Sequence, residues 1–156
     1  MDFEKLIKKD KYQVFLFACP ANLPFFFATH PWFVVNKKGE LSRWEIFWRP
    51  EKWDKRWGHL HKDFYPRPEQ GIEVFPFSRK YFWGNGKLLG CVEGDEASIA
   101  RRMADFIEQS PKQYPYCGRY AYTGPNSNTY VQWIISHFPE SGFKLPWNSF
   151  GKNFKI

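Results

Sequence analysis

The sequence predicts one α+β domain in which an antiparallel sheet packs with two or three helices. Segments dense in β-branched and aromatic residues, each bounded by Pro or Gly, fill most of the first half of the chain. Two segments with helical spacing follow in the second half. The 156 residues are the size of one ordinary domain, and no repeat or long linker divides them. We therefore expect a single domain over residues 1–156.

Three strands are expected in the first third of the chain. Residues 1–10 are charged and predict a frayed end or a short helix. Tyr12–Ala18 is rich in β-formers and predicts the first strand. Thr29–Val35 predicts the second strand, which ends at the turn 36–39. Leu41–Trp48 predicts the third, and the short Gly-containing turn makes it the hairpin partner of the second.

The middle of the chain gives weaker signals. Pro50–Gln70 is a basic segment, rich in Trp and Pro, without a clear period. Ile72–Phe77 and Lys87–Val92 predict strands on either side of a turn at 83–86. Gly118–Tyr122 predicts a further short strand.

Two helices are expected in the second half. Asp95–Ser110 is the clearer one: acidic residues open it, Pro111 closes it, and one face carries Ile99, Met103, Phe106 and Ile107. The second, Thr129–His137, ends at Pro139. The tail 142–156 is rich in Gly, Pro, Asn and rings, which predicts that it lies along the surface.

Composition narrows the class of protein. The chain holds 17 Phe, 8 Tyr and 8 Trp, a ring content that excludes disordered, coiled-coil and collagen-like proteins. The formal charge of +7 indicates a moderately basic surface. Three widely spaced cysteines, Cys19, Cys91 and Cys117, argue against a disulfide framework and a zinc knuckle. We expect a reducing compartment and a cytoplasmic location.

The segment 12–36 contains no charged residue and is long enough to span a bilayer. Pro20, Pro24 and Pro31 argue against a spanning helix, because each removes a backbone donor. The apolar run before Pro20 is also too short for a secretory signal. No transmembrane segment is expected.

The stretch Gly124-Pro-Asn-Ser-Asn-Thr-Tyr-Val131 is the most specific in the chain. Its Gly-Pro turn places Asn126 or Ser127 at the start of the second helix. A Ser127 oxygen there lies beside free backbone N–H groups at the positive end of the helix dipole, which favours an attacking oxygen and an oxyanion hole. The alternative is that Ser and Asn only cap the helix.

His30 begins a strand after an apolar run, which holds it against a buried sheet. A His beside a Ser at a helix start is a general base and nucleophile pair if a third group fixes the imidazole. Glu45, which shares a strand face with Arg43, is the candidate third group. The alternatives are a structural histidine and a surface carboxylate.

Two other clusters carry less weight. His59-x-His61-x-Asp63 offers three metal ligands without a fourth, so no metal and no cofactor is expected. Rings and cations that alternate between residues 43 and 57 could stack single-stranded nucleic acid, although rings that pack on the sheet explain the pattern better. They are Arg43, Trp44, Trp48, Arg49, Lys52, Trp53, Lys55, Arg56 and Trp57.

Several stretches together resemble one bacterial family of unknown function, marked by a Gly-Pro-Asn-Ser-Asn-Thr-aromatic signature. They are Phe27-Ala-Thr-His-Pro-Trp-Phe-Val-Val35, Arg43-Trp-Glu45, Trp83-Gly-Asn85, Gly94-Asp-Glu-Ala97, Tyr114-Pro-Tyr116, the Gly124 stretch, Leu145-Pro146 and Gly151-Lys152. The resemblance covers nearly all of the chain from the first strand to the tail.

The chain also distantly resembles permuted papain-like domains of the NlpC and lecithin–retinol acyltransferase type. There a strand His comes first and an Asn-Cys-aromatic helix start comes later, the order of His30 and Ser127 here. The resemblance implies a serine-dependent amidase or esterase that acts on a small molecule, peptide or lipid. It places Ser127 at the position of the nucleophile and His30 at that of the base. With Glu45 these residues form the expected catalytic site, and Asn126, Asn128, Tyr116 and Trp32 are the expected binding residues. The alternative is a binding module on a degenerate scaffold, for an anionic ligand or nucleic acid.

Overall fold

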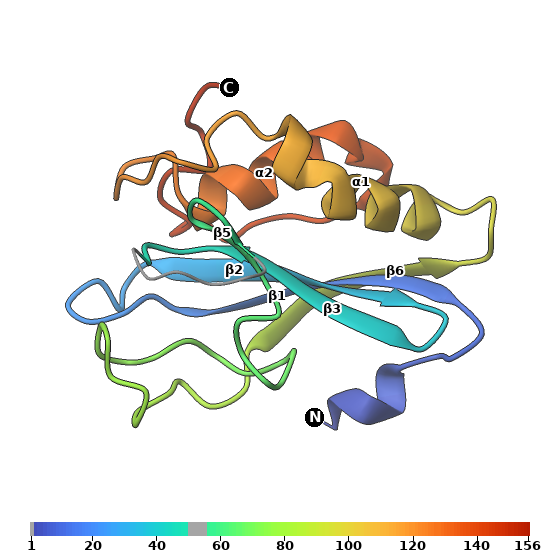
Figure 1. The fold of residues 1–156 in the computed structure, drawn as a ribbon, viewed down its shortest axis with the longest axis horizontal. Coiled ribbons are helices and arrows are strands. Elements are labelled where there is room, and N and C mark those ends of the chain that lie inside the picture. Colours follow the sequence, from blue (N-terminus) through green and yellow to red (C-terminus); the bar gives the residue numbers. More distant parts are fainter. Residues whose placement is uncertain (1, 50–55) are drawn as a thin grey trace.

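The computed structural model describes residues 2–49 and 56–156. Within these ranges, six strands form one antiparallel sheet in the order β4-β5-β3-β2-β1-β6, and two α-helices cover one of its faces (Figure 1). The α+β class predicted from the sequence is confirmed.

The strands follow the β-rich segments closely. The central three are β1 (Tyr12–Pro20), β2 (Thr29–Lys37) and β3 (Glu40–Ile46), and β2 and β3 form the expected hairpin. Gly39 closes the hairpin turn with φ of 100°, a conformation that L side chains rarely adopt. The outer strands are β4 (Arg56–Trp57), β5 (Leu60–Lys62) and β6 (Lys87–Gly94).

Two predicted strands are wrong. Ile72–Phe77 forms only an isolated bridge from Glu73, because Pro76 and a positive φ of 65° at Phe77 turn the chain. Gly118–Tyr122 is also not a strand, since Ala121 bonds to Pro125 and Gly124 within a local turn. The segment without a period contains β4 and β5, which are too short to show alternation.

Helix α1 spans Ile99–Gln113 and α2 spans Ser127–His137. The prediction that Pro111 ends α1 is wrong, because the helix continues past it to Gln113. Near this end of α1, the Ser110 hydroxyl lies 2.8 Å from Tyr130 Oη, which joins the last turns of α1 to α2. Short 3₁₀ helices at Phe3–Leu6 and Pro139–Ser141 complete the elements.

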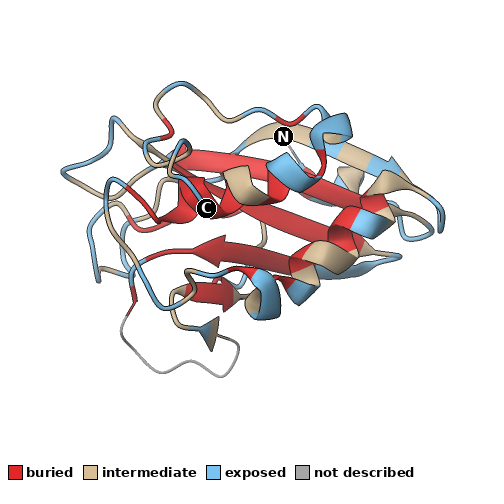
Figure 2. Ribbon diagram, turned by 90° about the horizontal axis from the view of Figure 1, so that it is seen from above, coloured by how far each residue is buried: buried red, intermediate tan, exposed pale blue. Residues whose placement is uncertain are grey.

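Both faces of the central sheet are buried, as Figure 2 shows. Side chains of β2 alternate between two cores: Phe33 and Val35 pack under the helices, whereas Trp32 and Val34 pack on the opposite face. That opposite face is covered by the N-terminal 3₁₀ helix and the irregular segment 63–86. Odd-numbered residues of β2 therefore face the helices, and even-numbered residues face the opposite side of the sheet.

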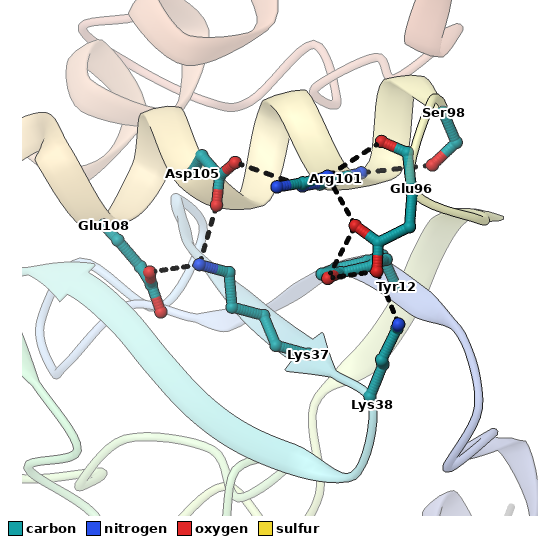
Figure 3. A network of polar contacts seen from close by, with 8 residues as sticks. All are labelled: Tyr12, Lys37, Lys38, Glu96, Ser98, Arg101, Asp105 and Glu108. Atoms are coloured by element: carbon teal, nitrogen blue, oxygen red, sulfur yellow. Dashed lines mark hydrogen bonds and ion pairs between the residues drawn. The ribbon is translucent and has the colours of Figure 1, made fainter.

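Ion pairs tie the β2–β3 turn to the start of α1 at one end of the sheet (Figure 3). Glu96 accepts from Lys38, Arg101 and the Tyr12 hydroxyl, and Lys37 lies 2.7 Å from Asp105. The opposite end of the sheet, where β1 runs into the loop 21–28, carries a cavity. Among the described residues, no helix is long and apolar enough to cross a membrane.

Candidate functional site

A cavity of about 420 Å³ opens at the end of the sheet where β1 ends, β2 begins and β3 ends. Its walls come from the loop 21–28, the residues after β3, the irregular segment near Glu73, the loop before α2 and the tail at Phe150. Aromatic side chains supply a large part of the apolar wall, and polar and charged groups lie among them, as in many small-molecule sites. His30, Asn126, Ser127 and Asn128 all line it.

His30 is fixed by a buried carboxylate. Its Nε2 lies 3.0 Å from Glu45 Oε2, and only 4% of His30 and none of Glu45 is exposed. The expected contact between these two residues is therefore present, and the alternative of Glu45 as a surface carboxylate is wrong. Nδ1 of His30 has no hydrogen-bond partner in the described parts of the chain, and the residue lines the cavity.

Arg43 completes a buried chain of charges behind His30. Its Nη2 donates to Glu45 Oε2 at 2.8 Å, and its Nε lies 2.7 Å from Glu45 Oε1. The guanidinium also donates to the Gln70 carbonyl and is sandwiched between the rings of Trp32 and Tyr65, whose centroids lie 4.2 and 4.6 Å away. A fork fixed on all sides leaves Glu45 one position.

Burial alone would raise the pKa of Glu45, but the charge of Arg43 and the bond from His30 outweigh it and lower the pKa to about 2. Glu45 is therefore an anion at neutral pH and accepts the proton on Nε2 of His30. This assigns the tautomer of the neutral imidazole: Nδ1, which faces no fixed partner, is the nitrogen without a proton.

A second buried cluster lies on the cavity wall. Arg49 and the Tyr65 hydroxyl both donate to the carboxylate of Glu73, and all three residues line the cavity. Burial raises the pKa of the Tyr65 hydroxyl above its usual range, so the phenol stays protonated. No pattern in the sequence connects these residues, because 24 positions separate Arg49 from Glu73 and neither stands in a periodic strand.

Asn126, not Ser127, caps α2. Its Oδ1 accepts from the backbone N–H groups of Asn128 and Thr129, and the Thr129 hydroxyl accepts from the N–H of Asn126. The cap consumes the backbone donors of Asn126, Asn128 and Thr129. In the described ranges, neither the hydroxyl nor the N–H of Ser127 has a hydrogen-bond partner, so both remain available at the positive end of the helix.

Asn128 and the tail lock α2 to the sheet. The amide of Asn128 donates to the carbonyls of Thr29 and Phe150, and the Thr129 hydroxyl donates to the carbonyl of Gly151. The tail therefore does more than lie along the surface, because Ser149 is 1% exposed and Phe150 forms part of the cavity wall. Asn126 and Asn128 have structural partners for their side-chain amides.

The structure brings His30 and Ser127 to one cavity but not into contact. Because side chains alternate along β2, that of His30 lies on the same face as Trp32 and Val34, away from α2, whereas Thr29 faces Asn128. In the described chain no hydrogen bond joins His30 and Ser127. The two groups line the same cavity from opposite sides of the sheet end.

Two expected binding residues lie elsewhere. Trp32 is fully buried beneath Arg43, and its indole N–H donates to the Pro68 carbonyl at 2.9 Å. Tyr116 packs against Tyr114 and Phe154 on the helix side of the sheet. Neither residue lines the cavity, so the structure offers them no direct contact with its contents.

None of the three thiols is poised as a nucleophile. Burial raises the pKa of Cys19 to about 12 and those of Cys91 and Cys117 to about 11. Cys19 lies opposite His30 in the β1–β2 pairing, but its protonated thiol donates to the Pro20 carbonyl. A thiol with a raised pKa is a poor nucleophile at neutral pH.

Some of the rings and cations between residues 43 and 57 are buried, whereas Trp48 and Trp57 are 49% and 39% exposed. Arg43 and Arg49 are buried in carboxylate pairs, Trp44 is 2% exposed, and Trp57 stacks on it. Lys52, Trp53 and Lys55 lie outside the described residues. Within the described part of the chain, no three His, Cys, Asp or Glu side chains are grouped to hold a metal ion.

Comparison with known proteins gives a family but no characterised relative. No curated protein and no solved structure matches the chain. A family model described as "Protein of unknown function (DUF3750)" matches residues 11–154, which include the six strands and both α-helices of the described chain. The chain therefore belongs to the DUF3750 family.

Proposed function

We propose that the protein is a hydrolase that cleaves an amide or ester bond of a molecule bound in the cavity. The observation that carries the proposal is the buried chain Arg43–Glu45–His30, which ends at a cavity whose opposite wall holds the free Ser127 hydroxyl. An ionised carboxylate behind a histidine is the usual means of fixing a general base.

Ser127 is the proposed nucleophile. Its Oγ would attack the carbonyl carbon while the hydroxyl proton passes to Nδ1 of His30, and the Ser127 N–H would donate to the resulting oxyanion. The leaving amine or alcohol would take the proton from His30. Water, deprotonated by the same nitrogen, would then release the acyl group from Ser127. Because the two side chains are not in contact in the free protein, the transfer requires their approach on substrate binding or one bridging water.

The order of His30 and Ser127 along the chain supports the proposal, because permuted papain-like domains have the same order of base and nucleophile. A strand histidine precedes a helix whose first residue is the nucleophile, here α2 with Ser127 at its start. The orientation of His30 away from α2 is the feature that departs from a preassembled pair. The raised thiol pKa values leave serine as the better candidate nucleophile.

Labelling with a serine-directed fluorophosphonate tests the assignment. We expect the wild type to be labelled, Ser127→Ala to be unlabelled, and His30→Asn to be labelled about 100-fold more slowly because the base is lost. Ser136→Ala is the matched control, since Ser136 lies on the same helix, is exposed and bonds only to Gln132.

Absence of labelling at Ser127, with peptide mapping of any modified site, would rule out the nucleophile. If a panel of aryl esters and amides is hydrolysed in a manner that needs His30 but not Ser127, His30 activates water instead. If no hydrolysis occurs while apolar ring compounds still bind and quench tryptophan fluorescence, the cavity belongs to a binding module, the second candidate function.

A further inference from the structure

We propose that the cavity end of the molecule docks on an anionic lipid bilayer. The docking surface consists of the segments 21–28, 74–87, 114–126 and 146–156, which surround the cavity at the end of the sheet away from the β2–β3 turn (Figure 1). The inference goes beyond the proposed function and does not depend on it.

Exposed rings concentrate around the cavity mouth. Six of the exposed large apolar side chains line the cavity and are aromatic: Phe25, Phe27, Phe77, Tyr122 and Phe150 in the four segments, and Trp48 beside them after β3. Contacts between ring centroids, such as 4.6 Å for Phe25 and Tyr122, join different segments into one patch. Phe26 and Trp147, which are 57% and 83% exposed, extend it outward. A patch of this kind on a protein surface marks an interaction site.

The segments are joined to one another by hydrogen bonds. The Leu23 N–H donates to the Val74 carbonyl at 2.8 Å, and the Asn148 amide donates to the Phe27 carbonyl at 2.8 Å. The ring-bearing loop is thus joined to two neighbouring segments, so that the exposed rings form one continuous surface. Phe, Trp and Tyr are the residues that proteins place at the boundary between headgroups and acyl chains.

The four segments differ in charge from the opposite end of the sheet. The four segments contain six cations and no Asp or Glu, and the cations are Arg79, Lys80, Lys87, Arg119, Lys152 and Lys155. At the opposite end, Glu93, Asp95 and Glu96 pair with lysines and Arg101, as Figure 3 shows for Glu96. An anionic bilayer attracts a surface that has rings at its centre and cations around it.

A bilayer fits better than the other partners of this surface. The loop 21–28 has no charge at all, and the cations that stand beside Trp44 and Trp48 in sequence are buried in ion pairs, which is unfavourable for a nucleic-acid backbone. A second copy of the chain would bring two cationic ends together. Neutral ring-bearing tips flanked by cations instead match an interface of acyl chains and acidic headgroups.

Vesicle co-sedimentation tests the proposal. The full chain is mixed with vesicles of phosphatidylcholine alone or with phosphatidylserine at about one third of the lipid, at low and high salt. We expect binding to the phosphatidylserine vesicles, weakened by salt, and little binding to phosphatidylcholine alone. Replacing Phe26 and Trp147 together by Ala should weaken the affinity by about tenfold or more, since both rings leave water on docking.

Matched variants separate the docking surface from net charge. Lys80→Glu with Arg119→Glu should weaken binding by about fivefold for each cation lost. Lys5→Glu with Lys9→Glu lowers the formal charge by the same amount at the other end and should have a much smaller effect. Leu41→Ala, an exposed apolar residue on β3, should have none.

Three outcomes would overturn the proposal. The first is that wild-type protein fails to sediment with phosphatidylserine vesicles at low salt. The second is an equal loss for the two charge-reversal pairs, which would make the attraction unspecific. The third is that the Phe26 and Trp147 rings prove to hold another partner, seen as tight binding to a single-stranded oligonucleotide or as a dimer in sedimentation velocity that the ring variant dissociates.

Discussion

At the scale of single residues, Glu45 carries the candidate site. It is fully buried and in contact with both a guanidinium and an imidazole, so its charge is compensated twice. A buried ion pair contributes little net stability when intact but costs several kcal/mol when one partner is removed. The residue that positions His30 is therefore also one that the fold needs.

Glu45→Gln should lower the free energy of unfolding at pH 7 by about 3–5 kcal/mol, because Arg43 is left buried without a counter-charge. The pKa of Glu45 is lowered from 4.5 to about 2, so its contribution is complete above pH 4.5 and is lost as the pH falls toward 2. Urea titrations between pH 7 and 2 should show the difference from wild type shrinking over that window. Glu40→Gln, exposed on the same strand, should change stability by less than about 0.5 kcal/mol at any pH. A difference that persists unchanged at pH 2 would contradict the assigned charge.

His61 is also fully buried, but unlike Glu45 it is neutral and has no hydrogen-bond partner among the described residues. Its ring stacks on Phe47 at 4.3 Å. Burial lowers the pKa of His61 from 6.5 to about 4, so the folded protein holds it neutral while the unfolded chain protonates it. Stability is therefore lost as the pH falls from 6.5 to about 4.

His61→Phe keeps the stacked ring and removes two unsatisfied polar atoms. We expect the free energy of unfolding at pH 7 to be about 1–2 kcal/mol higher than in wild type, and the increase to be larger near pH 5. Thermal unfolding at several pH values measures both effects. The same replacement at exposed His137 should leave the acid dependence intact. An unchanged loss of stability between pH 6.5 and 4 in His61→Phe would show that His61 does not cause it.

At the scale of elements, the tail fixes the start of α2. The amide of Asn126 donates to the Phe150 carbonyl at 3.1 Å, and Gly151 lies against that amide with φ of 92°. A Cβ on Gly151 would come within 2.6 Å of the Asn126 amide nitrogen. Only glycine fits a backbone that is both left-handed and this close to the cap.

Gly151→Ala should therefore displace the cap and destabilise the protein by about 2–3 kcal/mol, the sum of backbone strain and a lost cap. Gly142→Ala is the matched control, since Gly142 has φ of 69° but a Cβ added there would have no atom within 4 Å. The control should show the backbone cost alone, about 1 kcal/mol. Equal losses in chemical denaturation would mean that contact with Asn126 contributes nothing.

The strands and helices that were predicted correctly are those whose secondary structure is determined by their own local sequence. β1, β2 and β3 are dense in β-formers and lie between turn residues, and α1 has a complete apolar stripe. The predictions at Ile72–Phe77 and Gly118–Tyr122 failed for one reason. Their composition favours strands, but their backbone groups bond within local turns and loops instead of a sheet. β5 forms because β3 offers it an edge and β4 pairs in turn with β5, and that information lies outside their own few residues.

The site was predictable in part for the same reason. Arg43 and Glu45 alternate onto one strand face and His30 lies in the neighbouring strand, and the structure brings Glu45 into contact with both. Which face His30 occupies relative to α2 depends on the packing of the helices, and the pairing of Arg49 with Glu73 depends on an irregular loop. Such contacts have no period that a sequence could show.

At the scale of the whole molecule, the domain has a rigid centre and an irregular end. β1 and β2 are hydrogen-bonded to strands on both sides and covered on both faces, whereas the cavity walls are loops. Amides of such central strands exchange with solvent only through global unfolding, while loop amides exchange through local opening. Rigid strands beside loop walls that open locally would let the cavity adapt to a ligand without disturbing His30.

Hydrogen–deuterium exchange with peptide-level mass spectrometry measures this division. We expect the slowest exchange in β1 and β2, with an opening free energy equal to that of global unfolding, and the fastest in the loop 21–28 and the segment 74–87. Gly151→Ala supplies the control: it should speed exchange in β1 and β2 by its full effect on stability, yet leave exchange in the two loops unchanged, since these open without global unfolding. If the loop 21–28 exchanged as slowly as β2, or accelerated in parallel with it, the cavity wall would belong to the rigid centre. His30 and the loop would then open together, and a cavity that adapts to its ligand would be excluded.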